Sequence, residues 1–533
     1  MDSFLNGSVD SMYEPMLMKD MGKAVDILLD TIKNKRKIRI IGDYDIDGIC
    51  SIYILFKGLL FLGADVDYEV PDRIKDGYGI NENLIKQAYD DGREVILTCD
   101  NGIAATEQVR YARSLGFTVI VTDHHDIRYE EIDGKKTYIL PEADAIVNPK
   151  QSDCSYPCSF LCGAGVAYKL MQELFKRTGN EGKEREFLVF AGIATIGDVV
   201  DLKDENRIFV KEGLKQFKET DNYGLRALTV INGLDDKEIC AYHIGFIIGP
   251  CLNASGRLDT AKRALKMLLS KNKYEAERLA GDLVSLNEER KSLTAAAVIL
   301  AEKIVDENYT DDTVLVIYLP DCHESIVGIV AGKIREKYYK PVIVLTKGED
   351  GVKGSARSIE SYNIFEKLCE CSHLLTKFGG HPLAAGMSLK EDNIEELRKY
   401  LNEHSNLTKD DLTEKVWIDV PMPLEYINED IINELSLLEP YGKGNEKPVF
   451  ADKNLIIVSF MRIGRDGKFA KMELKKNNGM SIFAMCFNNC DGLNEAFINN
   501  KKISCTYYPE INEFRGNKKL QICITGYRIE EDI

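Results

Sequence analysis

Three short, almost wholly apolar runs in the first quarter of the chain each end in acidic or imidazole side chains. The runs cover residues 38–42, 95–99 and 118–122, and helix-length segments at 83–91 and 105–115 lie between them. Apolar runs of this length are typical of parallel strands that are buried on both faces. Strands that alternate with helices predict an open, doubly wound α/β sheet.

The side chains that follow these runs are the candidates for chemistry. We interpret a further apolar stretch, residues 191–196, as another strand, and it runs into Asp198. Ligands of an open parallel sheet bind at the carboxyl ends of its strands, so we expect all of these side chains to meet in one crevice. With Asp198, the set comprises Asp43, Asp45, Asp47, Asp100, Asp123, His124 and His125.

So many carboxylates in one crevice repel one another strongly unless cations neutralise them. Carboxylate and imidazole ligands favour manganese, magnesium or iron over the thiolate sites that are typical of structural zinc. We therefore expect two divalent ions, Mn²⁺ or Mg²⁺, which together clamp a phosphodiester and activate the attacking water. A single aspartate at a strand end is often only a helix cap, so this prediction depends on all four sites occurring together.

Residues 274–308 predict one long helix. The segment contains no proline and only one glycine, and leucines recur at helical spacing, among them Leu279, Leu283, Leu293 and Leu300. This spacing predicts a single apolar stripe, with charged residues on the other faces. A helix of this length is suited to connecting two lobes.

A second α/β region follows the long helix, and a β-rich tail ends the chain. Residues 314–318 and 342–345 predict strands, with a helix at 326–338 between them. From residue 416, apolar and polar residues alternate, which predicts strands with one buried face. Five such strands fit a small barrel of the OB type, although immunoglobulin-like and SH3-like barrels show the same alternation. The expected strands are 455–460, 470–474, 481–486, 503–507 and 520–524.

The overall charge restricts how this chain can bind nucleic acid. The net charge is −17 and the isoelectric point about 5.1, whereas nucleic-acid-binding surfaces are usually basic. Any DNA path must therefore be a confined basic groove. No apolar run reaches the roughly 18 residues needed to cross a bilayer, and residues 1–23 carry no signal peptide. We expect a cytoplasmic protein with no membrane partner, whose 14 cysteines are reduced.

The Asp-His-His triplet at 123–125, with Asp45 and Asp47 upstream and Asp100 between them, resembles the signature of the DHH phosphoesterase superfamily. Further blocks resemble the RecJ family of that superfamily, including its DHHA1 and OB domains. In chain order these blocks lie at 148–149, 158–170, 249–259, 323–341, 353–358, 379–386 and 438–445. This sequence departs from the family pattern in detail at 323–325, and it has Ala356 where glycine is common.

The resemblance implies roles for individual residues. The implied metal-binding residues are Asp43, Asp45, Asp47, Asp100, His124, His125 and Asp198. The implied catalytic residues are Asp123, His124, His125 and His381, and the implied substrate-binding residues are Asn253, Arg257, Ser355, Arg357, Gly379, Gly380 and His381. Arg257, Ser355 and Arg357 would grip the 5′ phosphate. The two glycines would let the backbone approach DNA closely, and His381 would contact the scissile phosphate.

The resemblance also implies an activity: a single-stranded-DNA-specific 5′→3′ exonuclease that releases 5′ mononucleotides in DNA repair and recombination. Its substrate would be single-stranded DNA with a 5′ phosphate. A RecQ-type helicase and single-strand-binding protein are partners that the family implies. In the tail, Phe460, Phe469 and Phe483 are candidates for stacking on bases.

Three alternatives remain open at this point. A small-substrate enzyme of the DHH–DHHA1 kind, acting on short oligoribonucleotides or cyclic dinucleotides, would share the metal site but typically lacks the OB-like tail. A non-catalytic replication scaffold would have lost its metals, and the intact set of acids and histidines argues against it. An inorganic pyrophosphatase shares the DHH motif but should be much shorter.

The expected fold is a multidomain α/β protein with a parallel-sheet DHH domain, a long connecting helix, an α/β DHHA1 domain and a C-terminal OB-like β-barrel. The expected limits are 1–20 for an N-terminal tail, 21–272 for the DHH domain with a helical extension, 273–309 for the connecting helix, 310–412 for the DHHA1 domain and 413–533 for the OB-like domain.

Overall fold

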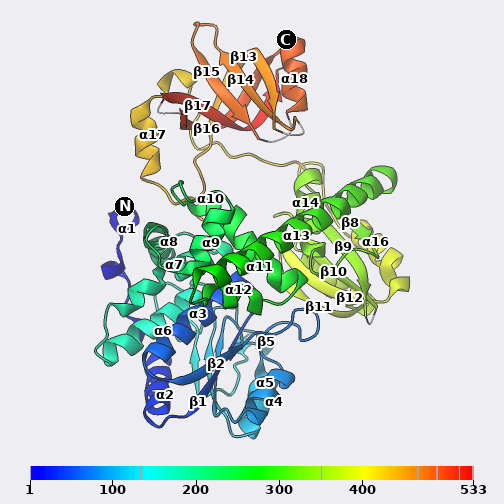
Figure 1. Ribbon diagram of the computed structural model, residues 1–533. Helices are drawn as coiled ribbons and strands as arrows, with labels where there is room; N and C mark the ends of the chain where they lie inside the picture. Colours follow the sequence, from blue (N-terminus) through cyan, green and yellow to red (C-terminus); the bar gives the residue numbers. More distant parts are fainter. Residues whose placement is uncertain are drawn as a thin grey trace. The chain divides into compact units, whose positions relative to one another are not determined.

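The structure, a computed structural model, falls into two compact units, which are described separately (Figure 1). The larger unit contains residues Gly7–Val200 and Asp204–Glu414, and the smaller one contains Met1–Asn6, Asp201–Lys203 and Lys415–Ile533. The structure describes residues 2–132, 135–349, 351–464, 467–487, 490–514 and 517–530. None of the helices in these ranges combines the length and apolar character that crossing a bilayer requires.

The first part of the larger unit, called here the parallel-sheet lobe (residues 7–200 and 204–272), is built on a five-stranded sheet. All its strands are parallel, in the order β2-β1-β3-β4-β7. The strands are β1 (Lys37–Gly42), β2 (Asp65–Glu69), β3 (Val95–Cys99), β4 (Thr118–Thr122) and β7 (Ala145–Val147). The three predicted strands are confirmed. The edge strands β2 and β7 escaped prediction because β2 is interrupted by acids and β7 has only three residues.

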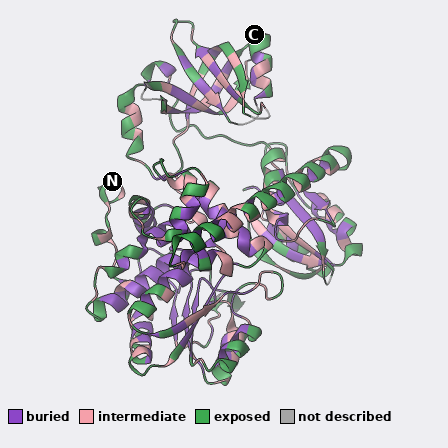
Figure 2. Cartoon of the chain, in the orientation of Figure 1, coloured by how far each residue is buried: buried purple, intermediate pink, exposed green. Residues whose placement is uncertain are grey.

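Both faces of this sheet are covered, which explains why its central strands are apolar throughout (Figure 2). Along β1, Ile38 and Ile40 face one buried core, whereas Ile41 faces another. The first core lies under α2 (Met21–Lys33), α3 (Ile46–Phe61) and α6 (Gly163–Arg177), and the second under α4 (Glu82–Asp90) and α5 (Thr106–Ser114). A separate hairpin, β5 (Tyr129–Ile132) and β6 (Lys135–Tyr138), leaves the lobe after β4.

A helical region follows the sheet. Its helices are α7 (Leu188–Gly197), α8 (Asp204–Phe217), α9 (Tyr223–Ile231), α10 (Ala241–His243), a π-helical turn at Ile244–Ile248, α11 (Gly249–Leu258) and α12 (Lys262–Leu268). The prediction that residues 191–196 form another strand was wrong, because they lie inside α7. Nearly every residue of α7 is buried, and periodicity cannot distinguish such a helix from a buried strand.

A buried ion pair connects this region to the N-terminal segment. Lys169 on α6 and Glu205 on α8 are both shielded from solvent, with 2.6 Å between the Lys169 ammonium and a Glu205 carboxylate oxygen. The hydroxyl of Tyr156 donates to the other Glu205 oxygen. Lys169 also donates to the Tyr13 carbonyl at 2.8 Å, while the Tyr13 N–H donates to Glu205. These bonds hold the N-terminal segment against the two helices.

The predicted long helix is α13 (Lys273–Asn308), but its leucine stripe is only half right. Leu279 and Leu283 are buried, whereas Leu293 and Leu300 are 40% and 50% exposed. The buried positions are Ala276, Leu279, Ala280, Leu283, Asn287, Thr294, Ala301 and Val305. The first half of α13 packs on α9, α11 and α12, and its end packs on α14 and β8. Small residues of α13 lie on the buried face where the neighbouring helices come close. The spacing of the leucines therefore predicted the wrong buried face for the second half of the helix.

The mixed-sheet lobe (residues 315–403) contains a sheet in the order β11-β12-β10-β9-β8. Only β8 and β9 are parallel; the other pairs are antiparallel. The strands are β8 (Leu315–Tyr318), β9 (Val342–Gly348), β10 (Gly351–Arg357), β11 (Leu375–His381) and β12 (Ala384–Leu389). One face packs on α14 (Val327–Tyr338), and the other on α15 (Ile364–Glu370) and α16 (Ile394–Glu403). The predicted α/β region is confirmed.

The smaller unit is a closed five-stranded barrel in the order β13-β14-β15-β17-β16. Its strands are β13 (Phe450–Ile463), β14 (Phe469–Lys475), β15 (Ser481–Cys486), β16 (Lys502–Phe514) and β17 (Asn517–Ile529), with α17 (Glu429–Ser436) before them. The third and fifth strands are parallel, and α18 (Asp491–Ile498) connects the third to the fourth. This is the OB arrangement, so that prediction is confirmed over the immunoglobulin-like and SH3-like alternatives.

Candidate metal centre and phosphate pocket

The strand register brings the acidic strand ends together. Gly42, the last residue of β1, pairs with Cys99 at the end of β3, which pairs with Thr122 at the end of β4. The three strands therefore end level. The residues that follow them, Asp43, Asp100 and Asp123, enter one crevice as predicted.

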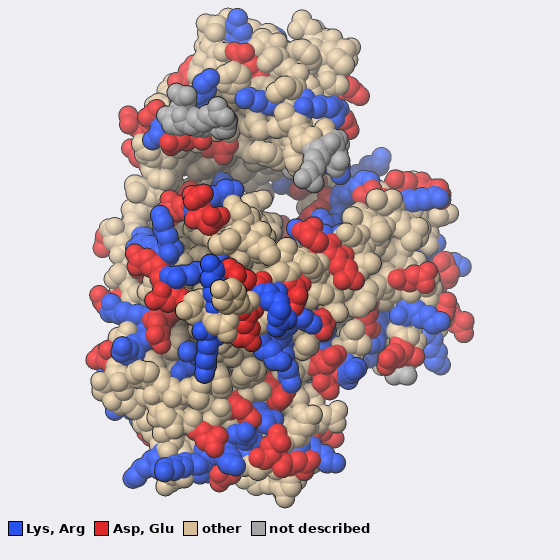
Figure 3. All heavy atoms as spheres, in the orientation of Figure 1, with Lys and Arg blue, Asp and Glu red and all other residues tan. Residues whose placement is uncertain are grey.

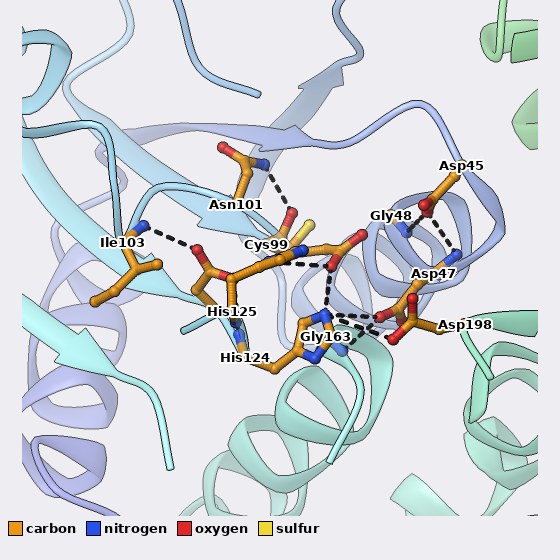
Figure 4. A network of polar contacts seen from close by, with 12 residues as sticks. Asp45, Asp47, Gly48, Cys99, Asn101, Ile103, His124, His125, Gly163 and Asp198 are labelled. Atoms are coloured by element: carbon orange, nitrogen blue, oxygen red, sulfur yellow. Dashed lines mark hydrogen bonds and ion pairs between the residues drawn. The ribbon is translucent and has the colours of Figure 1, made fainter. Parts of the chain in front are cut away.

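The first acidic turn is closed by its own helix cap. The Asp45 carboxylate accepts hydrogen bonds from the N–H groups of Asp47 and Gly48, at 3.0 and 3.1 Å, and so caps the N-terminus of α3 (Figure 4). The turn is tight: a Cβ at Gly48 would lie 2.3 Å from the Asp43 carbonyl oxygen. Asn253 on α11 supports the turn by accepting the N–H of Ile46 at 2.8 Å.

Asp47 belongs to the first turn of α3, but its carboxylate lies at the N-terminus of a second helix, α6. Its carboxylate accepts the N–H groups of Gly163 and Ala164, the first residues of α6, at 2.6 and 2.7 Å. A Cβ on Gly163 would lie 2.7 Å from the Asp100 Cβ, so this position has no room for a side chain. Burial and the neighbouring Asp45 charge outweigh the helix N–H groups and raise the pKa of Asp47 to about 6.

Asp123 supports the histidines and lies outside the cluster of possible ligands. Its oxygens accept the N–H groups of His124, His125 and Ile103, and one lies 2.7 Å from Nδ1 of His125. Burial would lower the pKa of His125, but the bond to Asp123 prevails and raises it to about 9. Burial likewise opposes the ionisation of Asp123, yet the same bond lowers the pKa of that carboxyl.

His124 has a buried ring nitrogen with carboxylates around it. Its Nε2 lies 3.1 Å from Asp100, 3.5 Å from Asp47 and 3.7 Å from Asp198, and forms no hydrogen bond among the described residues (Figure 4). Burial, followed by the charge on His125, lowers the pKa of His124 to about 3. A neutral imidazole with a free lone pair beside three acids is suited to bind a metal ion.

The possible ligands form one continuous cluster. Three groups of residues have ligand atoms within 4.8 Å of one another: Asp100 with His124 and His125, Asp47 with His124 and Asp198, and Asp43 with Asp45 and Asp100. Together they contain all seven predicted metal residues. Burial first, and then the charges of neighbouring acids, raise the pKa of Asp198 to about 8 and that of Asp100 well above its usual range.

This donor set fits hard divalent ions. The ligand atoms are carboxylate oxygens and imidazole nitrogens, as Mn²⁺ and Mg²⁺ sites use, with no thiolate in the three groups. Besides His124 Nε2, the Asp43 Oδ1 atom is buried with no hydrogen-bond partner among the described residues. Cations would satisfy these atoms and cancel the repulsion between the acids. Asp198 reaches the cluster from the end of helix α7. The prediction that every ligand follows a strand was therefore wrong for this residue.

A tyrosine that the sequence did not reveal lies over His125. The Tyr78 hydroxyl donates to the Asp100 carbonyl at 2.8 Å and lies 3.2 Å from the His125 ring nitrogens. Tyr78 stands between Gly77 and Gly79, which both have positive φ, in the loop between β2 and α4. The only sequence signal was this Gly-Tyr-Gly loop.

A cavity of about 640 Å³ lies between the two lobes of the larger unit. Four predicted substrate-binding residues line it: Arg257, Ser355, Arg357 and Gly379. It is also lined by residues that sequence reasoning missed, which are Tyr44, Arg73, Arg128, Lys353 and Lys377. Acidic and basic side chains are interspersed over the face of the molecule in Figure 3, so this basic pocket is the kind of confined site that the net charge of −17 demanded.

The pocket suits a phosphate group. Arg257 donates to the Ser325 carbonyl across the two lobes at 2.9 Å, and Arg357 donates to the Ser355 hydroxyl at 3.1 Å. Burial, then the charge of Arg73, lowers the pKa of Arg257 to about 10. The N-terminus of α14 also faces the pocket, through Val327 and its neighbours, and has no side-chain cap. Uncapped helix N-termini favour phosphate.

The remaining predicted residues lie around this pocket. Gly380 and His381 follow Gly379 on β11 and are exposed. A hydrogen bond from Lys150 lowers the pKa of Asp126, and the charge of His381 acts in the same direction, which places His381 near the end of the Asp-His-His segment. Asn253 accepts the N–H of Ile46, in the turn that contains Asp45 and Asp47, and does not line the pocket.

The structure places both departures from the family pattern in the mixed-sheet lobe. Ala356 is fully buried in the core beneath α15 and α16, on the side of β10 away from the pocket. Glu324 lines the pocket and pairs with Lys353 at 2.8 Å. Neither residue occurs in the metal cluster.

Comparison with protein families matches three consecutive regions. The DHH family, N-terminal domain, matches residues 37–196; the DHHA1 domain matches 311–405; and the RecJ OB domain matches 418–526. Together these matches cover most of the chain.

Individual relatives agree with this. The single-stranded-DNA-specific exonuclease RecJ of Bacillus subtilis is 37% identical over 99% of this chain, which spans 66% of the relative's length. The protein of the same name from Haemophilus influenzae is 32% identical, over 98% of this chain and 92% of the relative. The crystal structure of RecJ in complex with Mn²⁺ from Thermus thermophilus superposes with a TM-score of 0.82 and 28% identity, over 97% of this chain and 72% of that one.

Proposed function

This chain belongs to the RecJ family, and from that premise we propose that it is an exonuclease specific for single-stranded DNA, which cuts from the 5′ end with two divalent ions. The observation that carries the proposal is that one short turn serves both sites. Tyr44 lines the phosphate pocket, while its neighbours Asp43 and Asp45 belong to the metal cluster. An end held in the pocket therefore lies at a fixed distance from the metals, which sets the cut at one nucleotide.

We assign the two ions, Mn²⁺ or Mg²⁺, to the cluster of Asp43, Asp45, Asp47, Asp100, His124, His125 and Asp198. Such a pair supplies Lewis-acid activation of both the phosphodiester and the attacking water. The protein keeps the ligands in place by hydrogen bonds: helix α6 holds Asp47, and Asp123 orients His125. Asp123 is thus a positioning residue, and Asn253 is another, through Ile46.

The phosphate pocket gives the reaction its direction. Arg257, Ser355 and Arg357 bind the 5′ phosphate, and the arginines can each offer two N–H donors to it. In this proposal the exposed backbone at Gly379 and Gly380, on β11, would lie against the DNA strand, and His381 would contact the scissile phosphate. With the 5′ phosphate fixed, the first internucleotide bond would lie at the metal-binding residues, and its hydrolysis would release a 5′ mononucleotide.

The barrel unit supplies a second contact with the strand. On its outer surface, the ammonium groups of Lys471 and Lys519 lie 5.4 and 5.9 Å from the ring centre of Phe483, which is 38% exposed. An exposed ring flanked by cations suits a base and its phosphates. Phe469 is equally exposed and packs edge-on against Phe487, whereas Phe460 stacks on Phe497. We assign base stacking to Phe483 and Phe469 first.

The domain limits follow from the proposal: a tail at 1–20, the DHH domain at 21–272, the connecting helix at 273–309, the DHHA1 domain at 310–412 and the OB domain at 413–533. The proposed biological setting is DNA repair and recombination, in the cytoplasm. A helicase of the RecQ type and single-strand-binding protein are the partners that membership of the family implies.

The test is digestion of a 5′-phosphorylated, 3′-labelled DNA strand, beside its duplex and its RNA counterpart, with Mn²⁺ and then with EDTA. The proposal expects metal-dependent shortening of the single strand from its 5′ end, with the duplex spared. Survival of long DNA together with cleavage of dinucleotides or short RNA would favour a small-substrate enzyme. Absence of cleavage with any divalent ion would favour the scaffold.

A single substitution tests the metal assignment. Asp100 has a φ of +60°, which asparagine tolerates better than alanine, so Asp100→Asn is the cleaner variant. It should abolish cleavage and leave the far-UV circular dichroism unchanged. Asp90→Asn, at an exposed position at the end of α4, is the control and should keep full activity.

A further inference from the structure

The phosphate pocket carries more positive charge than one terminal phosphate needs. Its cationic lining residues are Arg73, Arg128, Arg257, Lys353, Arg357 and Lys377. The only carboxylate in the lining is Glu324, which pairs with Lys353. The other five cations form no ion pair within the described part of the chain. A phosphate monoester carries a charge of roughly −2, so binding one would leave about three positive charges in a partly buried pocket without a counter-charge.

Strand register arranges the mixed-sheet side of the pocket in three rows. Directly opposed residues of antiparallel strands share a face, and alternate residues along one strand return to it. The first row is Arg357–Ala384–His381, the second is Ser355–Gly386–Gly379, and the third is Lys353–Ser388–Lys377. At about 3.4 Å per residue, successive rows lie roughly 7 Å apart.

The middle row is a bare floor. A Cβ built on Gly379 or Gly386 meets no atom within 4 Å, so the space above both glycines is open. Ser355 provides the only side chain beyond Cα in this row. The first row contains His381, which lies near Asp126 at the end of the Asp-His-His segment. The third row lies on the opposite side of the middle row, with Lys353 and Lys377 on either side of Ser388.

We propose that the row of Lys353, Ser388 and Lys377 is a subsite for the outer phosphates of a 5′-triphosphate, so that the enzyme accepts strands with a triphosphate end. The inference rests on the proposed function, which places the phosphate attached to the 5′ carbon at Arg257, Ser355 and Arg357. A triphosphate end carries roughly −4, one charge for each bridging phosphate and two for the terminal one, which comes within one charge of the five cations that form no ion pair among the described residues.

The reaction on such an end differs only in its first product. Water adds its oxygen to the phosphorus of the first internucleotide bond, the bond from that phosphorus to the 3′ oxygen breaks, and the 3′ oxygen takes a proton. The first nucleotide leaves as a nucleoside 5′-triphosphate, and the shortened strand keeps a 5′ monophosphate. Every later cycle then starts from a monophosphate end.

The experiment compares DNA strands of one sequence with 5′-hydroxyl, 5′-monophosphate and 5′-triphosphate ends, all 3′-labelled and digested by the 533-residue protein with Mn²⁺. The first product is identified by mass spectrometry, and kcat/KM is measured for each end. The proposal expects a deoxynucleoside triphosphate as first product, and kcat/KM for the triphosphate strand at least equal to that for the monophosphate strand. Lys377→Ala should lower the triphosphate-to-monophosphate ratio of kcat/KM at least tenfold.

Lys390→Ala is the matched control, because Lys390 is exposed just after β12 and outside the pocket lining. Its ratio should equal that of the unmodified protein. A triphosphate strand that resists digestion while the monophosphate strand is cut would overturn the subsite. So would a Lys377→Ala variant that slows both strands equally, because the lysine would then serve the strand in general. If the monophosphate strand itself is not cut, the proposed function fails, and this inference fails with it.

Discussion

Removing the metal ions should make the stability of the larger unit fall as the pH rises from 6 to 8. The pKa of Asp47 is raised to about 6 and that of Asp198 to about 8, so the folded, metal-free protein holds protons that the unfolded chain has already lost. Unfolding then releases protons, and a higher pH favours it. Titrating both groups across this window costs about 3 kcal/mol, most of it from Asp198, at about 1.4 kcal/mol per pKa unit.

Thermal melts in EDTA and in Mn²⁺, at pH 6 and pH 8, measure this effect. The metal-free protein should melt at a lower temperature at pH 8, and Mn²⁺ should raise the melting temperature more at pH 8 than at pH 6. Asp198→Asn cannot ionise and should reduce the pH dependence in EDTA, whereas His125, whose pKa is also raised, should retain its part of it. A metal-free stability that stays constant or rises between pH 6 and 8 would refute the reasoning, because the carboxylates would then not be crowded.

Three further changes test how the centre is held. Gly163→Ala would place a Cβ 2.7 Å from the Asp100 Cβ and should lower kcat at least tenfold, whereas Gly332→Ala, a helical glycine with open space around it, should leave kcat unchanged; a normal kcat for the first variant would contradict the close approach. Asp123→Asn removes the charge that raises the pKa of His125, so that pKa should fall, as NMR titration of the ring would show; an unchanged value would mean that another group holds the imidazolium. Lys169→Met leaves Glu205 buried without its partner and should cost about 3–5 kcal/mol in urea denaturation, and a loss below 1 kcal/mol would show that water reaches the pair.

The metal cluster was predictable from sequence because its ligands occupy positions that topology alone brings together. Asp43, Asp100 and the Asp-His-His segment each follow a strand of one parallel sheet, and level strand ends leave them no other place. Asp198 follows a buried helix instead of a strand. The sequence of that helix is uniformly apolar, so its periodicity does not distinguish it from a buried strand. The residue was identified, but its local structure was not.

The pocket was harder to predict because its residues come from loops and from rows across strands. Arg73 lies in the irregular loop after β2, and Arg128 lies just before the β5–β6 hairpin, where no period marks a functional face. Lys377 lies on the same face as Lys353 only through Ser388, and that register is invisible until the sheet is formed. Family resemblance supplied Arg257, Ser355 and Arg357, which neither spacing nor composition would have identified.

Helix α13 gives the larger unit a mechanical property. Its 36 residues extend about 54 Å, its two ends are anchored in different lobes, and its middle stands largely in solvent. Under the proposed function, the distance between a bound 5′ phosphate and the metal-binding residues is therefore maintained partly by the bending stiffness of this helix. A proline in the exposed stretch near Ile299 would introduce a joint, and the enzyme would then release fragments of mixed length instead of uniform mononucleotides. Under the proposed function, the uniform length of the products therefore depends on helix α13 remaining straight.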